Sequence, residues 1–300
     1  FPIRYMKKNE EIRLALGTVQ FGLDYGVSNT SGKVDESKIF EILNEAAKMN
    51  IDTLDTAMLY GNSESVLGRA GVSDFNVVTK LPPIPKQVTN IKTWVIENIN
   101  SSLNKLNVDK VYGLMLHRSD DFLGEKGFKL YKILCKLRED GIVNKIGVSI
   151  YSPDELDSLE SSGIKIDIIQ APFNILDRRI ETSGWLGKLK TSGVEIHTRS
   201  VFLQGLLLLE SNKRDPYFSK WKDCFDEFDK WIKKTNQTPL GACLNFVNSF
   251  NEIDKIVVGI ETIDQLRKIA SSIDNSYKAH IPDHLQINDT MLIDPSNWRC

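Results

Sequence analysis

Short apolar segments recur along the entire chain, and helical patterns separate them. Each segment is rich in Ile, Val or Leu and is short enough to form one strand. The segments cover residues 12–19, 51–57, 76–81, 111–117, 145–150, 166–171, 195–200 and 255–260. Strands that alternate with helices form parallel sheets, and eight such units in about 250 residues are typical of one barrel. The sequence therefore predicts an α/β fold, a (β/α)8 TIM barrel.

The stretches between these segments carry apolar residues at helical spacing. In residues 36–50, for example, Ile39, Leu43 and Ala46 share one face. Similar patterns predict helices over residues 90–107, 128–140, 152–162, 217–234, 238–250 and 262–272. Because two of these helices precede the last strand, we expect an extra helix between strands seven and eight. No low-complexity linker divides the chain, so residues 1–300 are predicted to form a single domain.

A doubly wound open sheet is the competing fold for alternating strands and helices. Such a sheet, if it bound a dinucleotide, would normally show a G-x-G-x-x-G turn after its first strand. The corresponding stretch is LGTVQFGLDYG (16–26), which does not fit that pattern. The closed barrel is therefore the favoured prediction.

The composition indicates a globular protein with no electrostatic preference for polyanions. Of the 300 residues, 41% are hydrophobic and 26% are charged, and the formal net charge is −2. This balance argues against nucleic acid or an anionic membrane as a partner.

The four cysteines lack the spacing of metal ligands, so no metal site is expected. No apolar run approaches the ~20 residues of a membrane span, and the first residues lack the apolar segment of a secretory signal, so we expect a cytoplasmic location.

Four titratable side chains fall at or just after the ends of consecutive predicted strands. Asp55 ends the second strand, Lys80 the third and His117 the fourth, while Tyr60 lies in the loop after the second. Each alone has a structural explanation, such as a helix cap or a core histidine. Because the carboxyl ends of barrel strands share one face, where barrel enzymes place their chemistry, the four are expected to converge. An unpaired buried carboxylate is costly, so Asp55 is expected to face Lys80, with Tyr60 over the pair.

This set of side chains suggests a reaction. A tyrosine hydroxyl has an ordinary pKa of about 10 and is a poor acid at neutral pH. We expect the Lys80 ammonium to lower the pKa of Tyr60, and Asp55 to hold Lys80 in place. His117 can donate a hydrogen bond to a carbonyl oxygen. The arrangement predicts reduction of a carbonyl group, with Tyr60 as the proton donor and a cofactor as the hydride source.

The order of the motifs extends the argument beyond these four residues. LGTVQFG (16–22), LDTAMLYGNSESVLG (54–68), VVTKL (77–81) and LMLH (114–117) are followed by GVSIY, IQAPFNILDRR, RSVFLQGLL and VVGIETIDQL. In this order and spacing, from about residue 13 to about residue 272, the chain resembles the aldo-keto reductase family of nicotinamide-dependent barrel oxidoreductases. The resemblance implies that Asp55, Tyr60, Lys80 and His117 form the catalytic tetrad.

The resemblance also implies a bound NADPH or NADH. It places Gly17, Thr18 and Asp55 near the nicotinamide ribose, Ser149 and Gln170 at the carboxamide, and Arg199 in a stack on the nicotinamide. The loop over the pyrophosphate would contain Ser200, Phe202, Gln204 and Gly205. The adenosine end would be bordered by Gly259, Thr262 and Gln265.

The chain departs from the family pattern at three of these places. Ile150 stands where an asparagine is usual, and Arg199 stands where an aromatic residue is common. In the turn after the last strand, Glu261 replaces the cation that pairs with the 2′-phosphate of NADP. Arg267 or Lys268 is positioned to compensate, so the preference between NADPH and NADH stays open.

Two other functions remain open at this point. The same barrel can serve as a cofactor-binding regulatory or redox-sensing protein with little turnover, because a fold does not fix a function. A lyase or isomerase that uses Lys80 as a Schiff-base nucleophile would need an apolar pocket that lowers the pKa of the lysine. Asp55 nearby favours the charged lysine and argues against this alternative.

The substrate is expected to be a small-molecule carbonyl compound, and a sugar-like one suits the flanking residues. Segments 22–29 and 287–300 are the candidate contacts, through Asp24, Tyr25, Trp298 and Arg299. Their aromatic and polar side chains suit a hydroxylated ligand. The sequence leaves the oligomeric state open.

Overall fold

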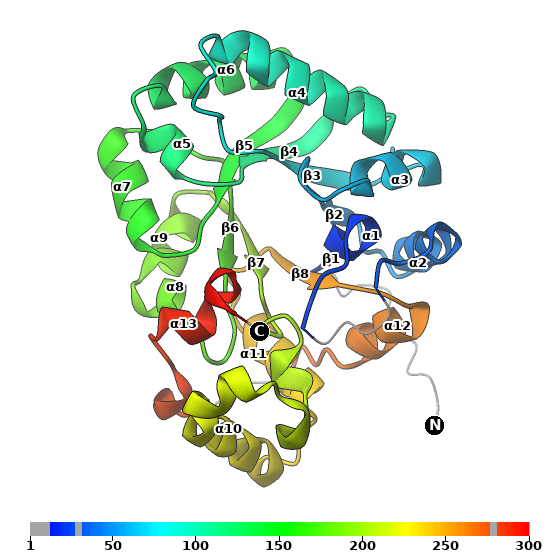
Figure 1. Cartoon of the computed structure of the whole chain (residues 1–300), viewed down its shortest axis with the longest axis vertical. Coiled ribbons are helices and arrows are strands. Elements are labelled where there is room, and N and C mark those ends of the chain that lie inside the picture. Colours follow the sequence, from blue (N-terminus) through cyan, green and yellow to red (C-terminus); the bar gives the residue numbers. More distant parts are fainter. Residues whose placement is uncertain (1–12, 28–31, 277–280, 300) are drawn as a thin grey trace.

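The protein is described here by a computed structural model, which places residues 13–27, 32–276 and 281–299. Within them eight parallel strands close into one barrel in chain order, as Figure 1 shows. The strands are β1 (Leu14–Gly17), β2 (Thr53–Asp55), β3 (Asn76–Leu81), β4 (Val111–Leu116), β5 (Val143–Ser149), β6 (Ile168–Pro172), β7 (Glu195–Arg199) and β8 (Lys255–Gly259). β1 pairs with both β2 and β8, which closes the ring. The prediction of a (β/α)8 barrel is confirmed.

Helices surround the strands in Figure 1. The α-helices are α1 (Val19–Gly22), α2 (Glu36–Lys48), α3 (Ser63–Ala70), α4 (Ile91–Leu106), α5 (Asp120–Leu123), α6 (Gly127–Glu139), α7 (Asp154–Ser162), α8 (Arg179–Thr182), α9 (Trp185–Thr191), α10 (Lys222–Lys234), α11 (Pro239–Asn248), α12 (Ile263–Ser271) and α13 (Thr290–Ile293). The helical patterns of the sequence all correspond to helices. Sequence patterns missed α3 and α9, which cover about two turns each, and the four-residue helices α1, α5, α8 and α13, because such short segments show too little periodicity.

The extra helix between β7 and β8 is present. α10 precedes α11, and Figure 1 shows α10 at the edge of the molecule, away from the ring of strands. α11 begins where the sequence places it, because the Thr238 hydroxyl accepts a hydrogen bond from the Gly241 N–H at 3.1 Å and Pro239 occupies the first turn. α10 turns Phe225, Phe228 and Trp231 inward, so its apolar stripe is buried.

The strands are buried on both faces, which explains why their sequences show no polar alternation. In β1, for example, Leu14, Ala15 and Leu16 are each 0% exposed. None of the helices in the described ranges is long and apolar enough to cross a membrane. The predicted single domain of residues 1–300 also includes residues 1–12, 28–31, 277–280 and 300, which lie outside the described residues.

Candidate active site

A buried ion pair joins the ends of two adjacent strands. Asp55 is the last residue of β2, and Lys80 is the penultimate residue of β3. The Lys80 Nζ lies 2.7 Å from Asp55 Oδ1, and it also donates to the Thr56 carbonyl oxygen at 3.0 Å. The Gln170 amide, from β6, donates to the same Asp55 Oδ1 at 2.7 Å. The structure therefore brings Asp55 and Lys80 together as the strand ends predict, and it adds Gln170 to the pair.

Tyr60 lies over this pair. The Lys80 Nζ is 5.3 Å from the centre of the Tyr60 ring. The His117 ring meets the Tyr60 ring edge to face, with 6.2 Å between the ring centroids. The backbone before α3 fixes this position: a Cβ at Gly22 would lie 1.8 Å from the Tyr60 carbonyl oxygen, so only glycine lets the two loops approach so closely. The four residues predicted to converge do lie together.

The electrostatics of Tyr60 differ from the sequence prediction. Burial is the largest influence and raises the pKa of Tyr60, and the Asp55 carboxylate raises it further. The expected lowering of this pKa by Lys80 is therefore wrong. The reason is that burial outweighs the nearby cations, and the Asp55 carboxylate, 2.7 Å from Lys80, adds to the rise. The cation that acts to lower the pKa of Tyr60 is Arg199. Tyr60 thus holds its proton at neutral pH.

His117 is neutral at the same pH. Burial, followed by the charges of Lys80 and Arg199, lowers the pKa of His117 to about 4. Its Nδ1 is buried and lacks a hydrogen-bond partner among the described residues. A neutral imidazole carries one N–H donor and one acceptor nitrogen, so His117 can orient a polar ligand without adding charge.

The low pKa of His117 predicts a dependence of stability on pH. In the unfolded chain the imidazole has its ordinary pKa of 6.5, whereas in the folded protein the pKa is about 4. Between these values the unfolded chain binds more protons, so the contribution of His117 to stability is complete above pH 6.5 and is lost as the pH falls toward 4. Urea unfolding midpoints measured across this window should fall less in His117→Gln than in the wild type. Equal losses in the two proteins would contradict the neutral buried histidine.

One cavity of about 690 Å³ opens beside these residues. Its volume lies in the range typical of small-molecule sites. The predicted residues that line it are Gly17, Thr18, Asp55, Tyr60, Lys80, His117, Ser149, Gln170, Arg199, Ser200, Phe202, Gln204, Gly205, Gly259 and Gln265. Thr262 is not among the lining residues; its hydroxyl caps α12 by accepting from the Gln265 N–H at 3.1 Å. The residues predicted to contact the nicotinamide ribose and the carboxamide thus line one cavity.

The loop after β7 has an unusual backbone where it borders the cavity. Ser200, Leu203, Gln204 and Gly205 have φ values of 62°, 49°, 54° and 88°. The other described non-glycine residues with positive φ are asparagines, which tolerate that conformation. Strain of this kind costs about 1–3 kcal/mol per residue and concentrates at ligand sites. Turn backbone with successive N–H groups on one side can form a concavity that binds anions.

The far end of the cavity carries charges of both signs. Glu261 lines it, and the Glu261 N–H donates to the Gln265 side chain at 2.8 Å. Arg267 turns away and pairs with Glu45 on α2, with 2.8 Å between Nε and Oε1. Lys268 lines the cavity. Of the two cations suggested to compensate for Glu261, therefore, only Lys268 borders this space.

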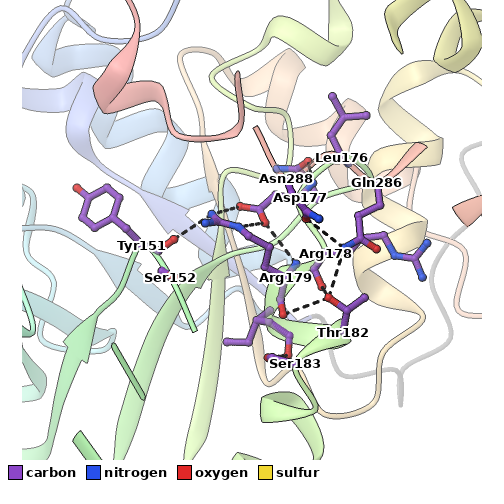
Figure 2. Close-up of polar contacts among 12 residues, drawn as sticks. Tyr151, Ser152, Leu176, Asp177, Arg178, Arg179, Thr182, Ser183, Gln286 and Asn288 are labelled. Atoms are coloured by element: carbon purple, nitrogen blue, oxygen red, sulfur yellow. Dashed lines mark hydrogen bonds and ion pairs between the residues drawn. The ribbon is translucent and has the colours of Figure 1, made fainter. Parts of the chain in front are cut away.

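Sequence reasoning missed three polar lining residues, which are Tyr151, Gln20 and Thr238, the cap of α11. Tyr151 lies two residues beyond the end of β5, in the kind of loop where barrel enzymes place functional residues, so its position in the sequence could have indicated it. Figure 2 shows how it is held: Arg179, paired with Asp177 at 2.8 Å, donates from its guanidinium to the Tyr151 carbonyl oxygen at 3.0 Å. Gln20 lies in the short helix α1, and its Oε1 is buried without a partner in the described structure. No sequence signal marks Gln20.

Of the residues predicted to contact the substrate, only some border the cavity. Tyr25 lines the cavity. Trp298 does not: its ring packs edge to face on Phe218, with 4.9 Å between centroids, and its indole N–H donates to the Leu292 carbonyl oxygen at 2.9 Å. Asp24 and Arg299 are also absent from the described lining. The part of the prediction that places Trp298 at the ligand is wrong, because its ring packs on Phe218, just before α10, and does not border the cavity.

Comparisons with known proteins place this barrel and site in a known group. A sequence model described as the Aldo/keto reductase family matches residues 13–281. The aldo-keto reductase YhdN of Bacillus subtilis is 24% identical over 58% of this chain and 54% of that protein. A putative voltage-gated potassium channel subunit beta of Schizosaccharomyces pombe is 24% identical over 92% of this chain and 82% of that protein. The solved structure of aldo-keto reductase AKR11C1 from Bacillus halodurans superposes with a TM-score of 0.69 at 21% identity, covering 89% of this chain and 88% of that one.

The family match and relatives named as oxidoreductases identify this barrel as an oxidoreductase dependent on NAD(P)H. The chain belongs to the aldo/keto reductase family, because the family's sequence model matches most of its length.

Proposed function

We propose that this protein reduces the carbonyl group of a small aldehyde, ketone or sugar, and that Tyr60 donates the proton. The observation that carries the proposal is the grouping of Tyr60 and His117 with the buried Asp55–Lys80 pair on one cavity. The proton on Tyr60 is retained at neutral pH, as a general acid requires. His117 is neutral and contributes a hydrogen-bond donor.

Each residue of the site has a separate role in the proposed carbonyl reduction. NAD(P)H, when bound, supplies the hydride for the carbonyl carbon. The Tyr60 O–H bond breaks and its proton passes to the carbonyl oxygen, which yields an alcohol and leaves a phenolate that water reprotonates. His117 orients the carbonyl oxygen by a hydrogen bond. Asp55 and Lys80 neutralise each other under the reacting group, so they hold the Tyr60 ring without adding net charge.

The cavity has the features that a dinucleotide requires. The left-handed residues of the loop 200–205 suit a pyrophosphate, the Gln20 Oε1 is a buried acceptor in need of a donor, and Ser149 and Gln170 present hydroxyl and amide groups. We propose the nicotinamide near Asp55 and Gln170, and the adenosine near Gln265.

NADPH is not expected to be strongly preferred over NADH. Glu261 borders the cavity and repels a 2′-phosphate, while Lys268 offsets part of that repulsion. The expected dissociation constant of NADPH is therefore within about tenfold of that of NADH, a difference below ~1.4 kcal/mol. Fluorescence titration with the two cofactors side by side measures it.

Two variants test which charges determine the preference between NADPH and NADH. Glu261→Gln should tighten NADPH binding and leave NADH binding nearly unchanged, whereas Lys268→Gln should weaken NADPH alone. Wild-type binding of NADPH more than about tenfold tighter than NADH would contradict the assignment of Glu261.

The Schiff-base alternative has one observation in its favour. Burial lowers the pKa of Lys80, although the Asp55 carboxylate opposes this shift. The geometry argues against a nucleophile, because the Lys80 side chain is 1% exposed and donates to Asp55 and to the Thr56 carbonyl oxygen. Treatment with borohydride in the presence of a carbonyl substrate should leave Lys80 unmodified. A trapped adduct on Lys80 would favour the lyase or isomerase.

The redox-sensing alternative is supported by the channel-subunit relative. The experiment that separates it from the reductase is cofactor oxidation with a panel of aldehydes, ketones and sugars. We expect multiple turnovers with at least one of these classes. Retention of a tightly bound cofactor without turnover would favour the sensor.

A further inference from the structure

Arg199 reaches across the rim of the barrel into the cavity. It is the last residue of β7, yet its guanidinium donates to the Ile150 carbonyl oxygen, just beyond the end of β5, at 3.0 Å. The guanidinium also lies 4.6 Å from the centre of the Tyr151 ring and donates to the Ser200 hydroxyl at 3.2 Å. The side chain therefore spans β6 and is held between Tyr151 and the open space.

No carboxylate in the described part of the chain pairs with Arg199. Three other part-buried arginines each have a carboxylate partner: Arg178 pairs with Glu181, Arg179 with Asp177, and Arg214 with Asp229. Two hydrogen bonds to neutral oxygens leave several of the guanidinium's five N–H donors free for a ligand. Burial of half a cation's surface without a counter-ion lowers the stability of the fold. We therefore expect Arg199 to be retained for a functional reason, such as binding an anion.

Arg199 also determines the charge at the reacting end of the cavity. Asp55 and Lys80 neutralise each other, and His117 is neutral above about pH 4. The positive charge of Arg199 acts to lower the pKa of Tyr60, Lys80 and His117, although burial and the Asp55 charge raise the pKa of Tyr60 overall. A substrate bound next to Tyr60 therefore meets one uncompensated cation.

The Arg199 guanidinium is held in position by its neighbours without a ligand. Arg179 holds the Tyr151 backbone, as Figure 2 shows, and the Tyr151 ring in turn supports the Arg199 guanidinium. A guanidinium held in place loses little conformational freedom when it binds a planar anion in bidentate fashion.

We propose that Arg199 binds an anionic group of the substrate, so that the protein prefers carbonyl compounds that carry a carboxylate or a phosphate. This inference rests on the proposed carbonyl reduction and specifies its substrate class. Arg199 would be a substrate-binding residue in the same cavity.

The test compares substrates that differ only in charge. The 2-, 3- and 4-carboxybenzaldehydes are each paired with the corresponding carboxamide, and glyceraldehyde 3-phosphate is paired with glyceraldehyde. In the wild type, at least one charged member should have the higher kcat/KM. In Arg199→Gln, the ratio of charged to neutral kcat/KM should fall by about 10- to 100-fold, the loss expected for a charge-assisted hydrogen bond. Arg199→Lys should retain part of the ratio. The carboxylate and phosphate pairs show which anion the site takes.

Arg118→Gln is the matched control. Arg118 is exposed, lies next to His117 in sequence and does not line the cavity, so its removal subtracts the same charge without a direct contact. In Arg118→Gln, the ratio of charged to neutral kcat/KM should stay near that of the wild type. The affinity for NADH is measured for every variant. Equal kcat/KM for charged and neutral partners in the wild type would overturn the role of Arg199 and leave carbonyl reduction intact. A drop in NADH affinity with an unchanged ratio would assign Arg199 to the cofactor and also overturn it. Absence of turnover with every probe would overturn both proposals.

Discussion

Tyr60→Phe is expected to lose about 10²- to 10⁴-fold in kcat, the usual contribution of a general acid, while NADH still binds. The substitution removes the phenolic proton and keeps the ring, so the contacts of the ring with Lys80 and His117 persist. Steady-state kinetics on any accepted aldehyde, with NADH titration in parallel, measures both quantities.

Tyr131→Phe is the control for this variant. Tyr131 lies on α6 and does not line the cavity, so the same chemical change there should leave kcat unaltered. Turnover by Tyr60→Phe close to that of the wild type would require the proposed proton donor to be abandoned.

Lys80→Met is expected to be comparably severe in turnover and to destabilise the fold as well. The ion pair is buried, with the two side chains 1% and 6% exposed, so removal of Lys80 leaves an uncompensated carboxylate in the barrel. Breaking a buried pair in this way costs about 3–5 kcal/mol. The unpaired Asp55 charge would also raise the pKa of Tyr60 further and weaken it as an acid. Urea unfolding and kcat are the two measurements.

Double variants separate the two consequences of losing Lys80. Asp55→Asn combined with Lys80→Met removes both charges and should recover part of the stability, but not the activity. Tyr60→Phe combined with Lys80→Met should lose little more turnover than Tyr60→Phe alone, because both changes disable one proton-donating unit. Fully additive losses in kcat would show that Lys80 acts on a different step.

The sequence predicted the barrel well because its evidence is local. Each strand is a short run of Ile, Val and Leu, and burial of both faces removes any need for polar alternation, as in β1. Strand ends could also be located, and this placed Asp55, Lys80 and His117 on one rim. The exact strand limits were less predictable: residues 51–57 suggested one strand, but only Thr53–Asp55 belong to β2.

The errors came from properties that depend on distant contacts. The pKa of Tyr60 depends on how deeply its ring is buried and on the nearby charges of Asp55 and Arg199, and neither can be read from spacing. Trp298 was expected to contact a ligand, but its ring packs on Phe218, far away in sequence, and lies outside the cavity lining. The path of Arg199 toward Ile150 likewise follows from barrel closure rather than from the residues next to it.

The most direct test of carbonyl reduction is a single turnover of the wild-type protein. The protein, loaded with one equivalent of NADH, is mixed with excess carbonyl compound, drawn from the charged and neutral probes, and the loss of NADH absorbance is followed together with the appearance of alcohol. We predict that NADH is consumed and alcohol formed in equal amounts. NADH that stays bound and unoxidised, with the carbonyl compounds unchanged, would contradict the reductase and support a cofactor-sensing protein.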